Sequence, residues 1–201
     1  MKTIITSNLK LFMLKSDNIE DITTILLENG VLLHPTDTIW GLAADCYSVI
    51  GIDKIYNLKQ RDKSKPLILL VDSLKMLTHY VPHIHPRIET LLSLYKNPLT
   101  VVYPDVRTLP SNLIAKDKSI AIRIVQDDKC KAIIKALGRP ICSSSANTTG
   151  APFPTEYDKI QKHIINTVDI IDIQRNTTKH LSRPSVMIKY DSKGEIIFLR
   201  S

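Results

Sequence analysis

The sequence contains few glycines, and none of them belongs to either of the common phosphate-binding loops. Its 201 residues include six glycines, in no GxGxxG and no GxxxxGK[ST] arrangement. Those two patterns hold phosphates with backbone amides at the start of a helix. If this protein binds a nucleotide, positively charged side chains must therefore supply much of the phosphate recognition.

Cysteines and long apolar runs are also scarce. Cys46, Cys130 and Cys142 lie far apart and form no CxxC pair, which argues against a disulfide framework and against a zinc site. We expect three buried free thiols in a reducing compartment. No run approaches the ~18 apolar residues of a membrane span, so we expect a cytoplasmic protein with no membrane partner.

The chain is basic and has an ordinary globular composition. Lys and Arg number 27 against 20 Asp and Glu, the net charge is +7, and 43% of the residues are hydrophobic. An excess of positive charge favours polyanionic partners, either nucleotides or nucleic acid. The length predicts one core, and we expect residues 1–201 to form a single domain.

Apolar periodicity predicts an α/β protein with a mixed sheet. An Asp17/Glu20 capping box starts the first helix and Gly30 stops it. The segment from Pro35 to Cys46 contains so many turn formers that we expect it to be irregular. The DSKG sequence predicts a closing hairpin, and therefore antiparallel pairing at one edge. Strands are expected at 31–34, 67–71, 99–103, 119–125, 139–143, 168–173, 184–190 and 195–200, and helices near 19–26, 52–59, 73–80, 86–96, 127–137 and 156–166.

The segment KQRDKSKPL places Lys59, Arg61, Lys63 and Lys65 at alternate positions before an apolar strand. In an extended chain alternate side chains share one face, so the four cations would form a row. Helix spacing places Lys59 in a last helical turn, in which case the row begins at Arg61. The segment is either a solvated turn that protects the strand or an anion site.

Two further segments place hydroxyl groups after predicted strands. ICSSSANTTG begins at Ile141, and Thr36 and Thr38 follow the strand that ends at His34. Open α/β sheets bind ligands at the carboxyl ends of their strands. The alternative for both is a turn stabilised by Ser, Thr or Asp side chains. A serine hydrolase is disfavoured because no GxSxG pattern is present.

Arg123 lies inside the apolar segment SIAIRIV. A buried cation is costly unless it is paired or faces an anionic ligand, so Arg123 forms either a structural ion pair or a carboxylate clamp. His83 and His85 have no third ligand at a metal-binding spacing, and a surface loop is the better interpretation.

Taken together, PTDTIWGLAAD, KQRDKSKPL, PLT, SIAIRIV and SSANTTG resemble the YrdC-like L-threonylcarbamoyladenylate synthases in order and spacing. The resemblance covers about residues 20 to 190. It implies a twisted mixed β-sheet with flanking helices around a deep basic cavity. Two departures are Tyr95-Lys96-Asn97 before PLT and Pro184-Ser185-Val186 near the C-terminal end, where the family has Trp-Pro-Gly and Ser-Thr-Val.

The resemblance also implies an activity and a set of site residues. The enzyme would make threonylcarbamoyl-AMP and pyrophosphate from L-threonine, bicarbonate and ATP, for threonylcarbamoyladenosine modification of tRNA by a downstream transferase complex. Magnesium is expected on the phosphates, with no dedicated metal ligands and no catalytic nucleophile. Motif positions assign ATP binding to Lys59, Arg61, Lys65, Ser119, Ser145, Asn147 and Ser185, and threonine binding to Thr36, Arg123 and Ser143.

An RNA-binding function is the alternative from another class. A double-stranded RNA or tRNA-binding module of the same fold would explain the positive charge without any adenylate-forming activity. The sequence lacks an aromatic-basic stripe or an RNP-like motif, which counts against dedicated RNA recognition. Weak tRNA binding by an enzyme remains compatible with the charge.

Overall fold

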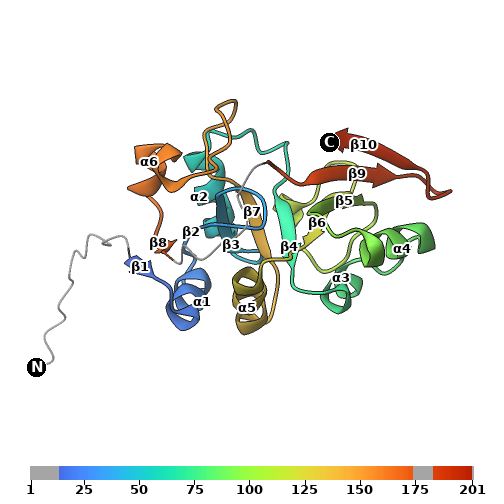
Figure 1. The fold of residues 1–201 in the computed structure, drawn as a ribbon, viewed down its shortest axis with the longest axis horizontal. Coiled ribbons are helices and arrows are strands. Elements are labelled where there is room, and N and C mark those ends of the chain that lie inside the picture. Colours follow the sequence, from blue (N-terminus) through green and yellow to red (C-terminus); the bar gives the residue numbers. More distant parts are fainter. Residues whose placement is uncertain (1–13, 174–182, 201) are drawn as a thin grey trace, which may run out of the picture.

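A computed structural model describes residues 14–173 and 183–200, which form one ten-stranded sheet with helices on both faces (Figure 1). The strand order is β1-β8-β2-β3-β7-β4-β6-β5-β9-β10. The strands are β1 (Leu14–Ser16), β2 (Leu32–His34), β3 (Gly41–Asp45), β4 (Ile68–Val71), β5 (Leu99–Tyr103), β6 (Ile120–Ile124), β7 (Ile141–Ser145), β8 (Ile170–Asp172), β9 (Val186–Tyr190) and β10 (Ile196–Arg200).

The sheet is mixed, as the sequence predicts, but antiparallel pairing is not confined to its edge. The β9–β10 hairpin forms the expected antiparallel edge. Antiparallel pairs also occupy the centre, where β7 lies between β3 and β4. The parallel pairs are β1–β8, β2–β8, β4–β6 and β5–β9.

The helices match most of the expected positions. They are α1 (Ile19–Leu27), α2 (Val49–Leu58), α3 (Leu74–Tyr80), α4 (Pro86–Leu94), α5 (Asp128–Leu137) and α6 (Lys162–Ile165), with 3₁₀ turns η1 (Ser111–Leu113) and η2 (Tyr157–Lys159). The expected helix over 156–166 is therefore wrong, because η2 and the single turn α6 replace it. Helix α1 begins after Asn18, whose side chain accepts from the Glu20 amide at 2.9 Å, so the Asp17 capping box is also wrong.

Successive side chains of the central strands point to opposite faces of the sheet, and a hydrophobic cluster lies on each face. In β3, Leu42 and Ala44 pack with Ile52 of α2, whereas Ala43 belongs to the cluster under α1 and α5. Figure 1 shows α1 and α5 side by side, and the two helices contact each other. Because side chains of a strand point to alternate faces, a sheet covered on both sides needs nearly continuous apolar strands.

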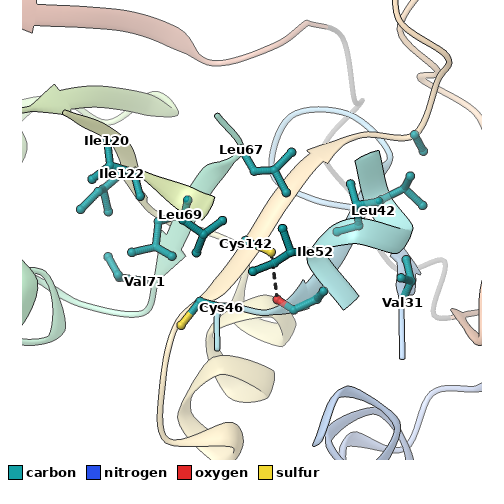
Figure 2. Packing of buried hydrophobic residues seen from close by; sticks show 14 of the residues in the cluster. Val31, Leu42, Cys46, Ile52, Leu67, Leu69, Val71, Ile120, Ile122 and Cys142 are labelled. Atoms are coloured by element: carbon teal, nitrogen blue, oxygen red, sulfur yellow. Dashed lines mark hydrogen bonds between the residues drawn. The ribbon is translucent and has the colours of Figure 1, made fainter. Parts of the chain in front are cut away.

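All three cysteines are buried and free, as expected. Cys142 lies in the cluster shown in Figure 2, where its thiol donates to the Ala44 carbonyl at 3.5 Å. Burial raises the pKa of Cys142 to about 12. These thiols therefore act as small apolar core residues.

Two strands were not expected. The segment 35–46 was expected to be irregular, yet β3 begins at Gly41 and lies between β2 and β7. The turn formers occupy only 35–40, which connects β2 to β3. β1 is a three-residue edge strand that pairs with β8, and so short a strand carries almost no sequence signal.

Within residues 14–173 and 183–200, no helix combines the length and the apolar character that a membrane crossing requires.

Candidate active site

A cavity of about 560 Å³ opens where the ends of several strands meet. Its volume falls in the range usual for ligand sites. The wall includes four cations and several hydroxyl residues, and none of its described residues is Asp or Glu. The polar and charged lining residues are Thr36, Thr38, Arg61, Ser64, Lys65, Ser119, Arg123, Ser143, Ser144, Ser145, Ser185 and Arg200.

Eight of the ten residues predicted for the site line this cavity. They come from segments far apart in the sequence, and the fold brings them together. The eight are Thr36, Arg61, Lys65, Ser119, Arg123, Ser143, Ser145 and Ser185. Lys59 and Asn147 are both buried and lie behind the wall.

Lys59 stabilises the turn that follows β7. Its Nζ donates to the carbonyl of Ser145 at 2.5 Å and to the carbonyl of Asn147 at 2.6 Å. It also lies 3.2 Å from Ser145 Oγ and 3.2 Å from Asn147 Oδ1. Burial, followed by the charge of Arg61, lowers the pKa of Lys59 to about 7, whereas the four oxygen acceptors favour the ammonium form.

Lys59 lies at the C-terminal cap of α2, close to the last-turn position that helix spacing predicted, but neither the row of four cations nor the row beginning at Arg61 forms. The chain bends after α2, where Gln60 has φ 48° and the amide of Lys65 donates to the Asp62 carbonyl at 3.0 Å. Lys63 consequently forms an exposed ion pair with Asp53 at 2.8 Å. Arg61 and Lys65 remain on the cavity wall.

Arg61 also shapes the loop from which it comes. Its Nε donates to the carbonyl of Lys65 at 2.9 Å, and its Nη2 donates to the carbonyl of Pro66 at 3.0 Å. Burial lowers the pKa of the Arg61 guanidinium. The side chain thus combines a structural contact with a position on the wall.

Arg123 forms the structural ion pair that was one interpretation of its sequence, and it also faces the cavity. Its partner is Asp37, with Nη2 and Oδ1 3.2 Å apart. Its Nη1 donates to Thr38 Oγ1 at 3.1 Å. The structural ion pair therefore leaves the arginine on the wall, where a carboxylate could bind.

The hydroxyls of Thr36 and Thr38 form an ordered chain beside Arg123. Thr36 Oγ1 donates to the carbonyl of Ile39 at 2.7 Å, and its distance to Thr38 Oγ1 is 2.8 Å. Because a hydroxyl has one hydrogen, the hydroxyl of Thr38 is the donor to Thr36. Both hydrogens are thus committed within the 36–39 turn.

Arg200 is the site residue that sequence analysis missed. It lies at the end of β10, beyond a register shift between Phe198 and Arg200, and it lines the cavity. Its Nε donates to the Ser185 carbonyl at 3.0 Å, and its Nη2 to Ser185 Oγ at 3.2 Å. Burial, and then the charge of Arg123, lowers the pKa of Arg200. A cation at the end of an apolar strand is the same signal that identified Arg123.

The other hydroxyl groups are also held by nearby partners. Ser185 Oγ lies 2.7 Å from Thr100 Oγ1, and Ser119 Oγ donates to Asp117 Oδ1 at 2.6 Å. On the opposite side, Gly41 pairs with Ser145, and a Cβ at Gly41 would lie 3.3 Å from Ser143 Oγ. A side chain at this position would therefore crowd the Ser143 hydroxyl on the cavity wall.

A family model named for Sua5, YciO and YrdC, and described as telomere recombination, matches residues 24–201. The chain belongs to this family. A threonylcarbamoyl-AMP synthase from Pseudoalteromonas atlantica is 32% identical over 150 residues, which span 73% of this chain and 80% of the relative. The protein of the same name from Escherichia coli O1:K1 / APEC is 30% identical over 151 residues, with 74% and 80% covered.

Solved structures of Sua5 and YciO share the fold of this Sua5/YciO/YrdC protein. P. abyssi Sua5 complexed with L-threonine superimposes with a TM-score of 0.80 at 23% identity, covering 94% of this chain and 57% of that one. E. coli YciO has a TM-score of 0.79 at 21% identity, with 94% of both chains covered. The predicted family and the twisted mixed α/β sheet with flanking helices are thus confirmed.

Proposed function

We propose that this protein is an L-threonylcarbamoyladenylate synthase, a nucleotidyltransferase that forms threonylcarbamoyl-AMP and pyrophosphate from L-threonine, bicarbonate and ATP. The observation that carries the proposal is the charge of the cavity wall. Arg61, Lys65, Arg123 and Arg200 line it, and its described residues include no carboxylate. Two relatives bear the name threonylcarbamoyl-AMP synthase.

The reaction requires two anions to meet. Threonine carbamate must approach the α-phosphorus of ATP, and two unit charges ~4 Å apart repel by about 4 kcal/mol at an effective dielectric near 20. Fixed cations offset this repulsion without any reorganisation during the reaction. A wall of arginine, lysine and hydroxyl groups supplies what such a step needs.

Arg61 and Lys65 are the proposed partners of the triphosphate. A guanidinium can bind two phosphate oxygens at once, and an ammonium group acts as a mobile point charge. Lys59 and Asn147 support the turn that carries Ser145, and Lys59 adds its charge from behind the wall. Ser119, Ser145, Ser185 and Arg200 complete the proposed ATP site.

Arg123, Thr36 and Ser143 are the proposed threonine site. All three line the cavity. The guanidinium of Arg123 would bind the threonine carboxylate, with Thr36 and Ser143 nearby to meet polar groups of the same substrate. A site that hydrogen-bonds a substrate hydroxyl discriminates strongly against an analogue that lacks it.

The proposed chemistry needs no nucleophile from the protein. The threonine amine attacks the carbon of carbon dioxide and releases a proton to solvent, or it attacks bicarbonate, in which case the amine proton and the departing hydroxide leave together as water. A carbamate oxygen then forms a bond to the α-phosphorus, the bond from this phosphorus to the bridging α–β oxygen breaks, and pyrophosphate leaves. The residues of the wall position these groups and stabilise the charge.

Magnesium fits this site only as part of the nucleotide substrate. The described wall offers hydroxyl oxygens but no carboxylate, and magnesium commonly keeps waters and binds substrate phosphates. We propose that the ion enters with ATP. The same proposal includes delivery of the product to a tRNA-modifying transferase, weak tRNA binding and a cytoplasmic location.

The deciding experiment measures pyrophosphate release from ATP and bicarbonate with and without L-threonine. We expect threonine to be required, valine to be poorly used, and mass spectrometry to detect threonylcarbamoyl-AMP. Equal release without any amino acid would instead indicate a nucleotide hydrolase.

Lys65→Ala should raise the KM for ATP, and Lys63→Ala is the matched control because that lysine pairs with Asp53 away from the cavity.

A further inference from the structure

Asp37 lies between two residues of the cavity wall but is not itself part of that wall. Thr36 and Thr38 line the cavity, whereas the side chain of Asp37 is 3% exposed and forms its contacts within the protein. An aspartate so fully buried is costly unless its charge is compensated. Its partners therefore indicate what it does.

The two carboxylate oxygens of Asp37 join the 36–38 turn to β6. Oδ2 accepts from the backbone amide of Gln126 at 3.0 Å, just beyond the end of β6. Oδ1 lies 3.2 Å from Nη2 of Arg123, whose side chain is 6% exposed. The bond from the Gln126 amide fixes the orientation of the carboxylate, and in this orientation Oδ1 faces the guanidinium of Arg123.

The same turn holds the second terminal nitrogen of Arg123. Nη1 donates to Thr38 Oγ1 at 3.1 Å, and the hydroxyl of Thr38 is oriented by its bond to Thr36. Each terminal nitrogen of a guanidinium carries two N–H groups. One N–H of Nη1 is used by Thr38, whereas Nη2 is held by the charge of Asp37 without a hydrogen bond to Oδ1, so both terminal nitrogens keep N–H groups for a ligand.

We propose that Asp37 is a positioning residue, which orients the guanidinium of Arg123 for the carboxylate of the amino-acid substrate. This inference rests on the proposed function, because it assumes that Arg123 binds threonine. A planar guanidinium held at two nitrogens cannot rotate about its terminal bond, and displacements of about 1 Å can cost on the order of a hundredfold in rate. Asp37 acts only through Arg123 and touches no reactant.

The direct test is Asp37→Asn, which keeps the size of the side chain and removes its charge. We expect the KM for threonine to rise on the order of tenfold, while the KM for ATP changes less than about twofold. The two KM values separate positioning from stability: a purely structural aspartate would lower the yield of active enzyme and leave both KM values unchanged.

Asp169→Asn is a matched control. Asp169 also combines an ion pair, with Lys54 at 3.1 Å, and a backbone contact, from the Val31 amide at 2.8 Å. It does not line the cavity, and we expect its substitution to leave the KM for threonine unchanged. An equal rise in both variants would overturn the proposal.

A second comparison decides the matter if Asp37→Asn does not fold. Arg123→Met and the double variant Asp37→Asn/Arg123→Met both lack the Arg123 guanidinium, so neither has an arginine left without its counter-charge. Because Asp37 is proposed to act only through Arg123, we expect the two proteins to have equal KM values for threonine. A further rise in the double variant would show that Asp37 acts independently of Arg123 and would overturn the proposal. Loss of threonine dependence in the unaltered enzyme would instead refute the proposed function.

Discussion

Arg123 and Arg200 bring charge into the cavity from strands whose other residues are mainly apolar. Each is held by hydrogen bonds to protein oxygens, Arg123 by Thr38 and Arg200 by Ser185. Burial is the main cause of the lowered pKa of Arg200, and the like charge of the nearby Arg123 adds to it. An anionic ligand between or beside them would relieve the repulsion between these like charges.

Arg200→Met should weaken ATP binding. Removing one of the four cations of the wall should raise the KM for ATP on the order of tenfold, because the triphosphate loses a charged partner. Arg139→Met is the matched control, since Arg139 pairs with Asp45 and does not line the cavity. Steady-state kinetics would contradict this assignment if both variants had the same KM.

His34 should make the fold sensitive to acid. The imidazole is buried, and burial, followed by the charge of Arg123, lowers its pKa to about 4. The unfolded chain, with a pKa near 6.5, binds the proton first, so stability is complete above about pH 6.5 and declines as the pH falls toward 4. The full span corresponds to roughly 3 kcal/mol in the free energy of unfolding.

Urea denaturation at about pH 7.5 and about pH 5 would measure this effect, with an expected loss of about 2 kcal/mol. His34→Gln removes the titrating group, so its stability should fall less between the same two conditions. Equal losses in the two proteins would assign the acid sensitivity to other groups.

For single residues, the sequence predicts which side chains lie at the cavity better than it predicts their hydrogen-bond partners. The motifs place eight residues on one wall because their segments lie in strands, or directly beside strands, whose ends meet at the cavity. They do not reveal that the Lys59 ammonium binds two carbonyls, because that contact depends on how the 145–147 turn folds over α2. Arg200 was missed although its position in an apolar strand resembles that of Arg123.

The turn of the β9–β10 hairpin contains a glycine with a positive φ that packs closely against His85. Gly194, in its turn, has φ 76°, and a Cβ there would lie 2.2 Å from Cε1 of His85. His85 caps α4 by accepting from the Arg87 amide at 3.2 Å. The hairpin that carries Arg200 is thereby packed against the start of α4.

Gly194→Ala should destabilise the protein through both backbone strain and this contact. Gly138→Ala is the control, because Gly138 has φ 72° but no atom within 4 Å of the added Cβ. We expect about 1 kcal/mol of destabilisation at Gly138 and more at Gly194. Chemical denaturation of both variants tests the difference, and equal losses would mean that His85 moves away without cost.

Among the elements, strands with an apolar run were predictable, including the three-residue β2 and β8, whereas β1 and β3 were missed. β4, β5, β6 and β10 lie within one or two residues of their expected bounds. β3 was missed because its glycine and two alanines carry little strand propensity, and its stability comes from pairing with both β2 and β7.

The cavity is a property of the whole molecule, since its wall includes Thr36 near one end of the described chain and Arg200 at the other. Ligands that bind only the folded protein therefore stabilise the fold as a whole. If the protein is a single domain, as predicted, it should unfold in one cooperative transition. ATP at 100 times its Kd should raise the free energy of unfolding by about 2.7 kcal/mol. Two separate calorimetric transitions, or a shift confined to one of them, would contradict the single-domain prediction.

The net charge of +7 permits a second whole-molecule test, against the RNA-binding alternative. A dedicated RNA-binding surface predicts an affinity for double-stranded RNA that falls steeply with salt and needs no threonine. At physiological salt we expect ATP and threonine to bind and double-stranded RNA to bind only weakly. Fluorescence anisotropy of labelled RNA and of a labelled nucleotide would measure both affinities. Tight RNA binding that ATP does not displace would favour the alternative.

The pairing of β9 with β5 also has a kinetic consequence. Val101 lies opposite Ile188, and Leu32 lies opposite Ile170, so the sheet closes only when distant parts of the chain have found each other. Long-range pairings of this kind slow folding because loop-closure entropy must be overcome first. A refolding chain should therefore regain helical circular dichroism earlier than its capacity to retain nucleotide.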